Sequence, residues 1–480
     1  MKRESVENQT LAIKEHLGYG SGSIGDALAY TMIGSFLMFF LTTIAGIKPF
    51  IAGSILAAGA VWNAFINPIV GFLSDKIHSR FGRRRPMILF FSIPLAISMF
   101  LAFTNLPIAG FLKPVYYGLV LMLLWTSYTG FFVPYLALGT GYTRDYRERT
   151  TLRLYASAFN SIGVVMTMTM PLLLVKALRS LGFSTNLSWS AVGACTGLLA
   201  TASIVVTVIT SKEKDPPQEK TQIPHIRDIR PKEIFREYLD IAKLQPMKYL
   251  VIASVFSLIA YTMIMSDMVY FLTYNRGLDA DKLSLALLSR AVMGLFFIPV
   301  VGKLSKKIDK RATLIFFYFI AACGMFLIRF TGVDTFPQLC LYVLFVSLCT
   351  SIYWQLIPSI YYDVCDYDRM VSGKSRQGSI LSFQGLVEAV AGGVGAQLLG
   401  LLLSIYEFQS DKLTQSERAL EGIFNCTTFI PVLFLLAAIY PIYKYPITRE
   451  THSRILKALK EDKDGIETAK SDLSEKPRQT

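Results

Sequence analysis

Long apolar stretches alternate with short polar connections along nearly the whole chain. Each stretch has about twenty residues or more, the length that an α-helix needs to cross the hydrocarbon core of a bilayer. Prolines and glycines inside several stretches fit membrane helices, because neighbouring helices satisfy the freed backbone groups. We therefore predict an all-α membrane protein with twelve transmembrane helices. The predicted spans are 24–45, 50–73, 87–105, 114–136, 154–178, 188–210, 247–273, 283–302, 312–330, 338–360, 379–405 and 422–443.

Composition supports a membrane protein over a soluble one. The 480 residues are 52% hydrophobic and only 17% charged, with a mean hydropathy of +0.44, whereas an average soluble domain carries about 25% charged residues. The six cysteines are scattered without a CxxC pair, so we expect no disulfide framework, no metal and no cofactor. The first 17 residues are polar, and we expect no cleavable signal peptide.

Lysines and arginines gather on alternate connections. Basic loops follow the second, fourth and eighth spans (74–86, 143–153 and 303–311), and the long connection 211–246 and the tail from 444 are also basic. The connections on the other side carry few positive charges. The positive-inside rule therefore places both termini and the basic loops in the cytoplasm of a multi-pass protein of the cell (inner) membrane. This distribution explains the net charge of +14 without a nucleic-acid partner.

The chain contains an internal repeat. PIVGFLSDKI at 68–77 and PVVGKLSKKI at 299–308 share seven of ten residues, at the ends of the second and eighth spans. Pro134 and Pro358 occupy matching places in the fourth and tenth spans, each ahead of a loop rich in Asp and Arg. Two parallel six-helix pseudo-repeats joined by a long cytoplasmic loop are the architecture of the major facilitator superfamily.

The repeat predicts four regions. They are an N-terminal six-helix bundle (1–210), a cytoplasmic linker (211–246), a C-terminal six-helix bundle (247–443) and a cytoplasmic tail (444–480). Within the linker, PKEIFREYLDIAKL has the pattern of a short amphipathic helix at the membrane surface, and a disordered linker is the alternative.

Three motifs carry a family resemblance. They are WNAFINP at 62–68 leading into GFLSDKIHSRFGRRRPMIL (71–89), VPYLALGTGYTRDYRERTTL (133–152), and DVCDYDRMVSGKSRQG (363–378). In order and position they resemble the glycoside–pentoside–hexuronide cation symporters, the family of the melibiose carrier. SRFGRRRP is also similar to the sucrose transporters. The resemblance covers most of the chain and implies sugar transport by a symporter of the major facilitator superfamily, without enzymatic activity.

The loop SDKIHSRFGRRRP resembles the gating motif of the superfamily. Asp75 would pair with Arg83, Arg84 and Arg85 between the two halves, hold the cytoplasmic side shut and release it as the bundle rocks. The alternative is that these arginines only set topology and contact anionic lipid.

Three acids lie within predicted spans, where charge is costly and each ionisable residue is a candidate for function. Asp26 lies within a residue of the place where the family has a sugar-binding carboxylate, and the alternative is a helix N-cap. Glu388, next to the position of a family lysine, either carries a proton, pairs with a cation on the solute or faces a polar cavity. Asp267 lies near the middle of the seventh span and has similar alternatives.

Aromatic residues follow one face of the fourth span. Trp125, Tyr128 and Phe132 stand at i, i+3 and i+7, and Tyr353 and Trp354 lie on the tenth span, its partner in the repeat. Such rings stack on a sugar or on a flat hydrophobic ligand, and ordinary helix packing gives the same pattern.

The chain departs from the family at its cation site. The family signature Trp-Asp-Ala-x-x-Asp-Pro carries two aspartates, and here both positions are amides, Asn63 and Asn67. Phe132 aligns with the family's aspartate in the fourth helix, and all four histidines lie outside the spans. Amides carry neither charge nor proton, so we expect transport to be insensitive to sodium. It is then either proton-coupled through Asp26, Asp267 or Glu388, or passive.

The leading hypothesis is a monomeric secondary carrier of a small sugar, glycoside or uronide, working by alternating access. The alternative is a carrier of an amphipathic, lipid-like or aromatic ligand, or an exporter, which the loss of polar site residues favours. A third alternative is a sensor or scaffold that uses the fold without transport. The sequence contains no GxxxxGK[ST] loop for ATP and no convergent His, Cys or metal cluster for an enzyme. Substrate identity and transport direction stay open.

Overall fold

The computed structural model describes residues 11–76, 84–141, 146–210, 231–373, 376–410, 412 and 414–459. Throughout these residues the secondary structure is helical, and π-helical turns follow two of the helices, α1 and α8. The elements are α1 (Ile13–Met32), η2 (Ile33–Leu37), η3 (Phe40–Ile44), α2 (Pro49–Lys76), α3 (Arg85–Ala102), α4 (Leu112–Gly141), α5 (Tyr146–Ser180), α6 (Thr185–Thr210), α7 (Pro231–Lys243), α8 (Gln245–Tyr270), η5 (Phe271–Asn275), α9 (Ala280–Lys307), α10 (Lys310–Thr331), α11 (Phe336–Ser372), α12 (Gln377–Ile405), α13 (Glu417–Thr427), α14 (Phe429–Lys444) and α15 (Arg449–Ala458).

Each predicted span corresponds to a helical element. In the described part of the chain, eleven helices are long and apolar enough to cross a membrane. The first span is built from α1, η2 and η3, whose glycine- and serine-rich start lowers its hydropathy. The last span is broken into α13 and α14. The all-α fold with about twelve membrane helices is thus confirmed. In the linker, α7 forms where a short helix was one of two alternatives.

Helix α1 begins at Ile13, earlier than the predicted start at residue 24. The preceding stretch is helical because its glycines let neighbouring helices approach closely. A Cβ on Gly22 would lie 2.7 Å from the ring of Tyr135 in α4 and 2.9 Å from the hydroxyl of Thr207 in α6. The stretch is therefore a packing surface that hydropathy alone does not reveal.

The chain forms two compact units. The first comprises residues 1–223, 262–292 and 392–427, and the second comprises 224–261, 293–391 and 428–480. Helices α8, α9 and α12 each contribute one part to each unit. The predicted six-helix halves stay a prediction, because the first unit combines residues of both halves.

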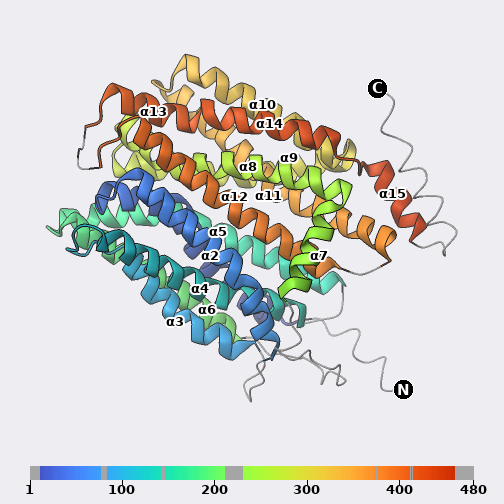
Figure 1. The fold of residues 1–480 in the computed structure, drawn as a ribbon. Helices are drawn as coiled ribbons and strands as arrows, with labels where there is room; N and C mark the ends of the chain where they lie inside the picture. Colours follow the sequence, from blue (N-terminus) through green and yellow to red (C-terminus); the bar gives the residue numbers. More distant parts are fainter. Residues whose placement is uncertain are drawn as a thin grey trace. The chain divides into compact units, whose positions relative to one another are not determined.

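The same pairs of spans pack together within each unit. In the first, α3 packs on α4 and α6 (Figure 1). In the same unit, α1 packs on α5 and α6. In the second, α10 packs on α11 and α14. Because α3, α4 and α6 are spans three, four and six, and α10, α11 and α14 are spans nine, ten and twelve, the packing repeats as the sequence does.

The first unit also joins spans from both sequence halves, at the end of the bundle where spans one and two connect (the 45–48 end). Ser266 of α8 donates a hydrogen bond of 3.0 Å to the main-chain oxygen of Gly34 in η2. The hydroxyls of Thr42 in η3 and Tyr270 in α8 are hydrogen-bonded. Lys176 at the end of α5 forms an ion pair with Asp281 at the start of α9. Spans one and five therefore contact spans seven and eight here.

Small residues form a seam between α2 and α12 in the same unit. A Cβ on Gly53 would lie 2.9 Å from the main-chain oxygen of Ala396. A Cβ on Gly400 would lie 3.1 Å from the Cα of Gly53, and one on Gly393 would lie 3.3 Å from the Cα of Ala57. Small residues at such spacing let membrane helices pack backbone against backbone.

Candidate solute-binding site

Asp26 lies in the second half of α1, and the residue as a whole is half-buried. Tyr128 of α4 donates a hydrogen bond of 2.7 Å to its Oδ1, and Asn160 of α5 donates one of 3.1 Å to its Oδ2. A position this far from the helix start excludes the N-cap alternative. Three helices thus converge on one carboxylate inside the apolar spans.

Aromatic rings cluster around Tyr128, which holds this carboxylate. Tyr128 stacks on Phe132 with a centroid distance of 5.3 Å and meets Trp125 edge-on at 5.6 Å. Tyr30 of α1, one turn beyond Asp26, lies 6.1 Å from Tyr128 and is 39% exposed. The structure therefore brings together four residues that the sequence singled out, Asp26, Trp125, Tyr128 and Phe132.

Asn160 and Tyr30 were missed by the sequence analysis. Asn160 is the polar residue that shares Asp26 with Tyr128. An amide in an apolar span is a signal that could have found it, because polar groups in membrane helices face the bundle interior or a cavity. Tyr30 stands four residues after Asp26, on the same face of the helix.

Asn63 and Asn67 lie on α2, which also packs against α4. Thr129 donates a hydrogen bond of 2.8 Å to Oδ1 of Asn63, and Asn67 donates one of 3.0 Å to the same oxygen. Trp62 donates to the hydroxyl of Thr126, also on α4. The amide oxygen of Asn63 thus already accepts two hydrogen bonds, and a cation would have to displace one of them.

In the second unit, the candidate acid Glu388 of α12 has polar hydrogen-bond partners. Its Oε1 accepts hydrogen bonds from Gln384 at 2.8 Å and from Tyr353 of α11 at 3.3 Å. Trp354, 38% exposed, meets Tyr261 of α8 edge-on at 5.9 Å. Trp354 also meets Tyr353 edge-on at 5.2 Å. Glu388 and Trp354 therefore belong to one polar and aromatic cluster, which resembles the cluster around Asp26 in chemistry.

Asp267 of α8 lies in the first unit and has a different environment. Its side chain is fully buried, and neither carboxyl oxygen has a hydrogen-bond partner among the described residues. The acid is adjacent to Ser266, which bonds across to Gly34. Of the three acids, Asp26 and Glu388 are partnered and partly accessible, and Asp267 is neither.

The arginines of the gating motif contact main-chain carbonyls within the first unit. Arg84 donates to the oxygen of Ala137 in α4, and Arg85 donates to that of Val208 in α6 at 2.9 Å. The side chain of Asp75 and the whole of Arg83 lie outside the described residues. The gating role stays a prediction.

The repeat reproduces these two contacts in the second unit. Lys310 donates to the main-chain oxygen of Ser359 in α11 at 3.3 Å, and Arg311 donates to that of Tyr445, just after α14, at 2.9 Å. Two adjacent basic residues therefore tie the start of span three to spans four and six, and the start of span nine to spans ten and twelve.

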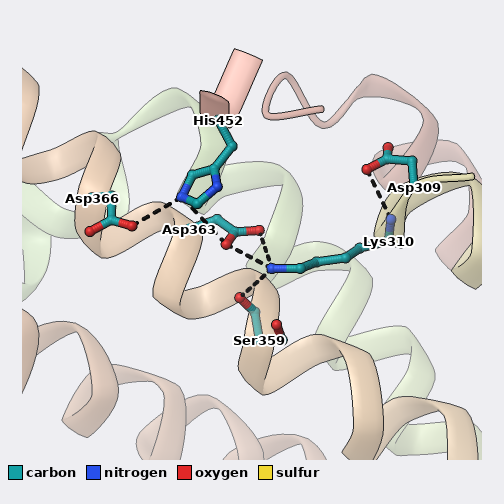
Figure 2. A network of polar contacts seen from close by, with 6 residues as sticks. All are labelled: Asp309, Lys310, Ser359, Asp363, Asp366 and His452. Atoms are coloured by element: carbon teal, nitrogen blue, oxygen red, sulfur yellow. Dashed lines mark hydrogen bonds and ion pairs between the residues drawn. The ribbon is translucent and has the colours of Figure 1, made fainter. Parts of the chain in front are cut away.

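Figure 2 shows what surrounds Lys310. Its ammonium lies 2.8 Å from both carboxylate oxygens of Asp363. His452 of α15 places Nε2 3.0 Å from Asp366 and 3.6 Å from Asp363 (Figure 2). Asp309 accepts a hydrogen bond from the main-chain N–H of Lys310 and caps α10. This network fastens α15 to the end of α11.

A third acidic residue of α11 lies nearby in the chain. Asp368, which is fully buried, forms an ion pair with Arg376 just before α12. This carboxylate raises the pKa of the Arg376 guanidinium. Helix α7 contacts the same region, where Tyr238 packs on Phe383 of α12 at 5.6 Å.

Comparison with known proteins places this geometry in a family. A family model described as "MFS/sugar transport protein" matches residues 18–449. The inner membrane symporter YicJ of Escherichia coli is 24% identical, with 95% of this chain and 97% of that one covered. The isoprimeverose transporter of Lactiplantibacillus pentosus is 24% identical over 88% of this chain and 87% of its own.

More distant relatives widen the range of named substrates. The sodium-dependent lysophosphatidylcholine symporter 1 of Mus musculus is 23% identical, with 99% of this chain and 94% of that one covered. A crystal structure of a bacterial homologue of the human lysosomal transporter Spinster covers 90% of this chain and 95% of its own, with a TM-score of 0.65 and 15% identity. That likeness shows the fold.

The family model spans most of the chain. The relatives named as a symporter and a transporter are each matched over 87% or more of their own length. The chain is therefore a multi-pass membrane transporter of small solutes, not an enzyme, and belongs to the MFS/sugar transport family of glycoside–pentoside–hexuronide-type symporters.

Proposed function

We propose that this transporter carries a small sugar, glycoside or uronide by alternating access and binds it at Asp26. The observation that carries the proposal is the carboxylate within the apolar spans, which Tyr128 and Asn160 hold beside aromatic rings. A carboxylate offers about four lone-pair directions. Two of these directions accept the hydrogen bonds from Tyr128 and Asn160, so about two remain for hydroxyl donors of a polyol. The rings of Tyr30 and Phe132 supply apolar surface for a sugar face.

The alternative solute is an amphipathic or lipid-like molecule. Phe132 stands where the family has an acid, and it stacks directly on Tyr128. This ring makes the site less polar than a free sugar would require. A relative named for lysophosphatidylcholine matches the whole length of the chain. Export of such a ligand belongs to the same alternative.

The coupling proposed is to protons and not to sodium. A sodium ion in a low-dielectric interior needs several oxygen ligands and a compensating negative charge. Asn63 and Asn67 supply no charge, and the Oδ1 of Asn63 is already taken by Thr129 and Asn67. Asp26 and Glu388 are partly accessible acids and are the proposed proton carriers. The sodium dependence in the name of the mouse relative belongs to that protein.

Sodium coupling is tested by uptake into vesicles at fixed pH, with sodium exchanged for choline. The proposal expects equal uptake, and a fall when the pH gradient is collapsed. A several-fold stimulation by sodium that is lost in Asn63→Ala would overturn it.

The orientation proposed follows the positive charge: both termini and the linker are cytoplasmic, and the 45–48 end faces outward. Insertion in the cell membrane as a monomer completes the proposal. The basic residues Arg84, Arg85, Lys310 and Arg311 then lie at the cytoplasmic ends of their helices, as the positive-inside rule requires.

A ligand screen tests the proposed solute. Thermal unfolding of the purified protein is measured with sugars, glycosides, uronides and lysophospholipids, because a ligand of the native state raises its Tm by mass action. We expect the rise with a glycoside or uronide, and we expect Asp26→Asn to abolish it. Asp279→Asn removes the same charge from an exposed loop and serves as the control. A rise with lysophospholipid alone would favour the alternative.

A further inference from the structure

The outward end of the first unit is closed in this structure. A layer of rings with centroids 5.3 to 6.5 Å apart is formed by Phe39 of span one, Tyr270 and Tyr274 of span seven, and Phe408 in the connection after span eleven. With the hydroxyl pair of Thr42 and Tyr270 and the seam of α2 and α12, this layer separates the interior of the unit from the outside.

Asp267 lies one helical turn below this layer. Its carboxyl is fully buried and has no hydrogen-bond partner among the described residues. The titratable groups that face it are Tyr270 on its own helix and Cys426 on α13. Neither carries a positive charge, and no basic side chain of the described residues is hydrogen-bonded to this carboxyl.

Such an environment accommodates only one form of the acid. An ionised carboxylate buried without a partner costs several kcal/mol, and the cost disappears when the group binds a proton. The closed outward end therefore holds Asp267 as the neutral acid. If spans one and seven separate, water reaches the carboxyl and the ionised form becomes favourable. Closure and proton binding are then linked equilibria.

We propose that Asp267 makes closure of the outward end depend on external pH. With the end open, a proton from external water forms an O–H bond on the carboxylate, and the ring layer then closes over the neutral acid. The proton returns to the outside when the end opens again, because no described residue around Asp267 accepts a hydrogen bond from it in the closed state. Asp267 thus sets the conformational balance, whereas Asp26 or Glu388 carries the coupled proton in the function proposed above.

The proposal is tested without solute, so its outcome is independent of the solute and of coupling. Spin labels are placed at Leu181 and Lys282, two exposed residues at the outward ends of spans five and eight, after the native cysteines are replaced. Double electron–electron resonance then measures the label-to-label distances from about pH 5 to about pH 9.

We expect the short-distance, closed population to grow at least about threefold as the pH falls. In Asp267→Asn the closed population should dominate at every pH. Asp267→Leu, neutral and of similar size, is the second variant and should behave alike, which guards against a folding defect in either one. Asp279→Asn, which removes a carboxylate from an exposed loop, is the control and should keep the pH dependence. Full pH dependence in a folded Asp267 variant, or none in the parent, would overturn the proposal.

Discussion

Tyr128 donates a hydrogen bond of 2.7 Å to Oδ1 of Asp26, and this bond joins the fourth span to the first within an apolar bundle. The bond fixes the carboxylate beside the rings of Trp125 and Phe132, which pack on Tyr128. The orientation of the proposed solute site therefore depends on one phenolic hydroxyl.

Tyr128→Phe removes that hydroxyl and keeps the ring. A hydrogen bond to a charged group contributes about 1.5–3 kcal/mol, so we expect affinity for the solute to fall about tenfold or more. Tyr117→Phe is the matched control. Tyr117 lies at the other end of α4, and its hydroxyl donates to the main-chain oxygen of Thr104, which precedes the helix. Binding is measured by calorimetry on the purified protein. Equal affinity in the two variants would exclude Tyr128 from the site.

Gly22→Ala tests the close packing of α1. The added Cβ would lie 2.7 Å from the buried ring of Tyr135, and overpacking of this kind costs about 1–3 kcal/mol. We expect a lower Tm in detergent. Gly118→Ala is the control, because no heavy atom lies within 4 Å of its Cβ. A Gly22 variant as stable as the Gly118 variant would show that α1 moves away at little cost.

Lys310→Met tests the network in Figure 2. The substitution leaves the Asp363 carboxylate, whose side chain is 10% exposed, without its ammonium. We expect a loss of about 1–3 kcal/mol in the free energy of unfolding, partly recovered in the double variant Lys310→Met/Asp363→Leu.

The control for that prediction is Lys176→Met. Its ion pair with Asp281 is more than half exposed on both sides, so the change should stay within about 0.5 kcal/mol. Equal losses at the two lysines, measured by thermal unfolding, would contradict a special role for burial at Asp363.

Orientation gives a further prediction. A reporter that is active only in the cytoplasm, fused after Thr480, should be active, and one fused in the connection at 45–48 should be inactive. Activity in the opposite pattern would reverse the proposed direction of both ends of the bundle.

Most of the spans were predictable because a long apolar stretch is enough to identify them. Asp26 and Tyr128 were both identified as candidates, but their hydrogen bond was not, because it joins residues 102 positions apart. Asn160 gave only the signal of one amide in an apolar span. The contact of His452 with Asp363 and Asp366 depends on how α15 returns to α11. No local pattern encodes that return, so the network required the structure.

The start of α1 shows a second limit of sequence patterns. Gly22 and its neighbours lower hydropathy, so the span was predicted to begin at residue 24 instead of 13. Glycine reports close approach only when the partner is known, and the partners here, Tyr135 and Thr207, are on other helices.

The seam between α2 and α12 has a consequence for repeated motion. Gly53, Ala396 and Gly400 meet with hardly any side chain between the two backbones. Glycine and alanine have no side-chain rotamers to gain when the helices separate or to lose when they meet. The change in side-chain conformational entropy at this contact is therefore small. Bulkier interlocking residues would have to be withdrawn and refitted in register at every cycle. The two helices instead meet as smooth surfaces, which suits a contact made and broken once for each molecule carried.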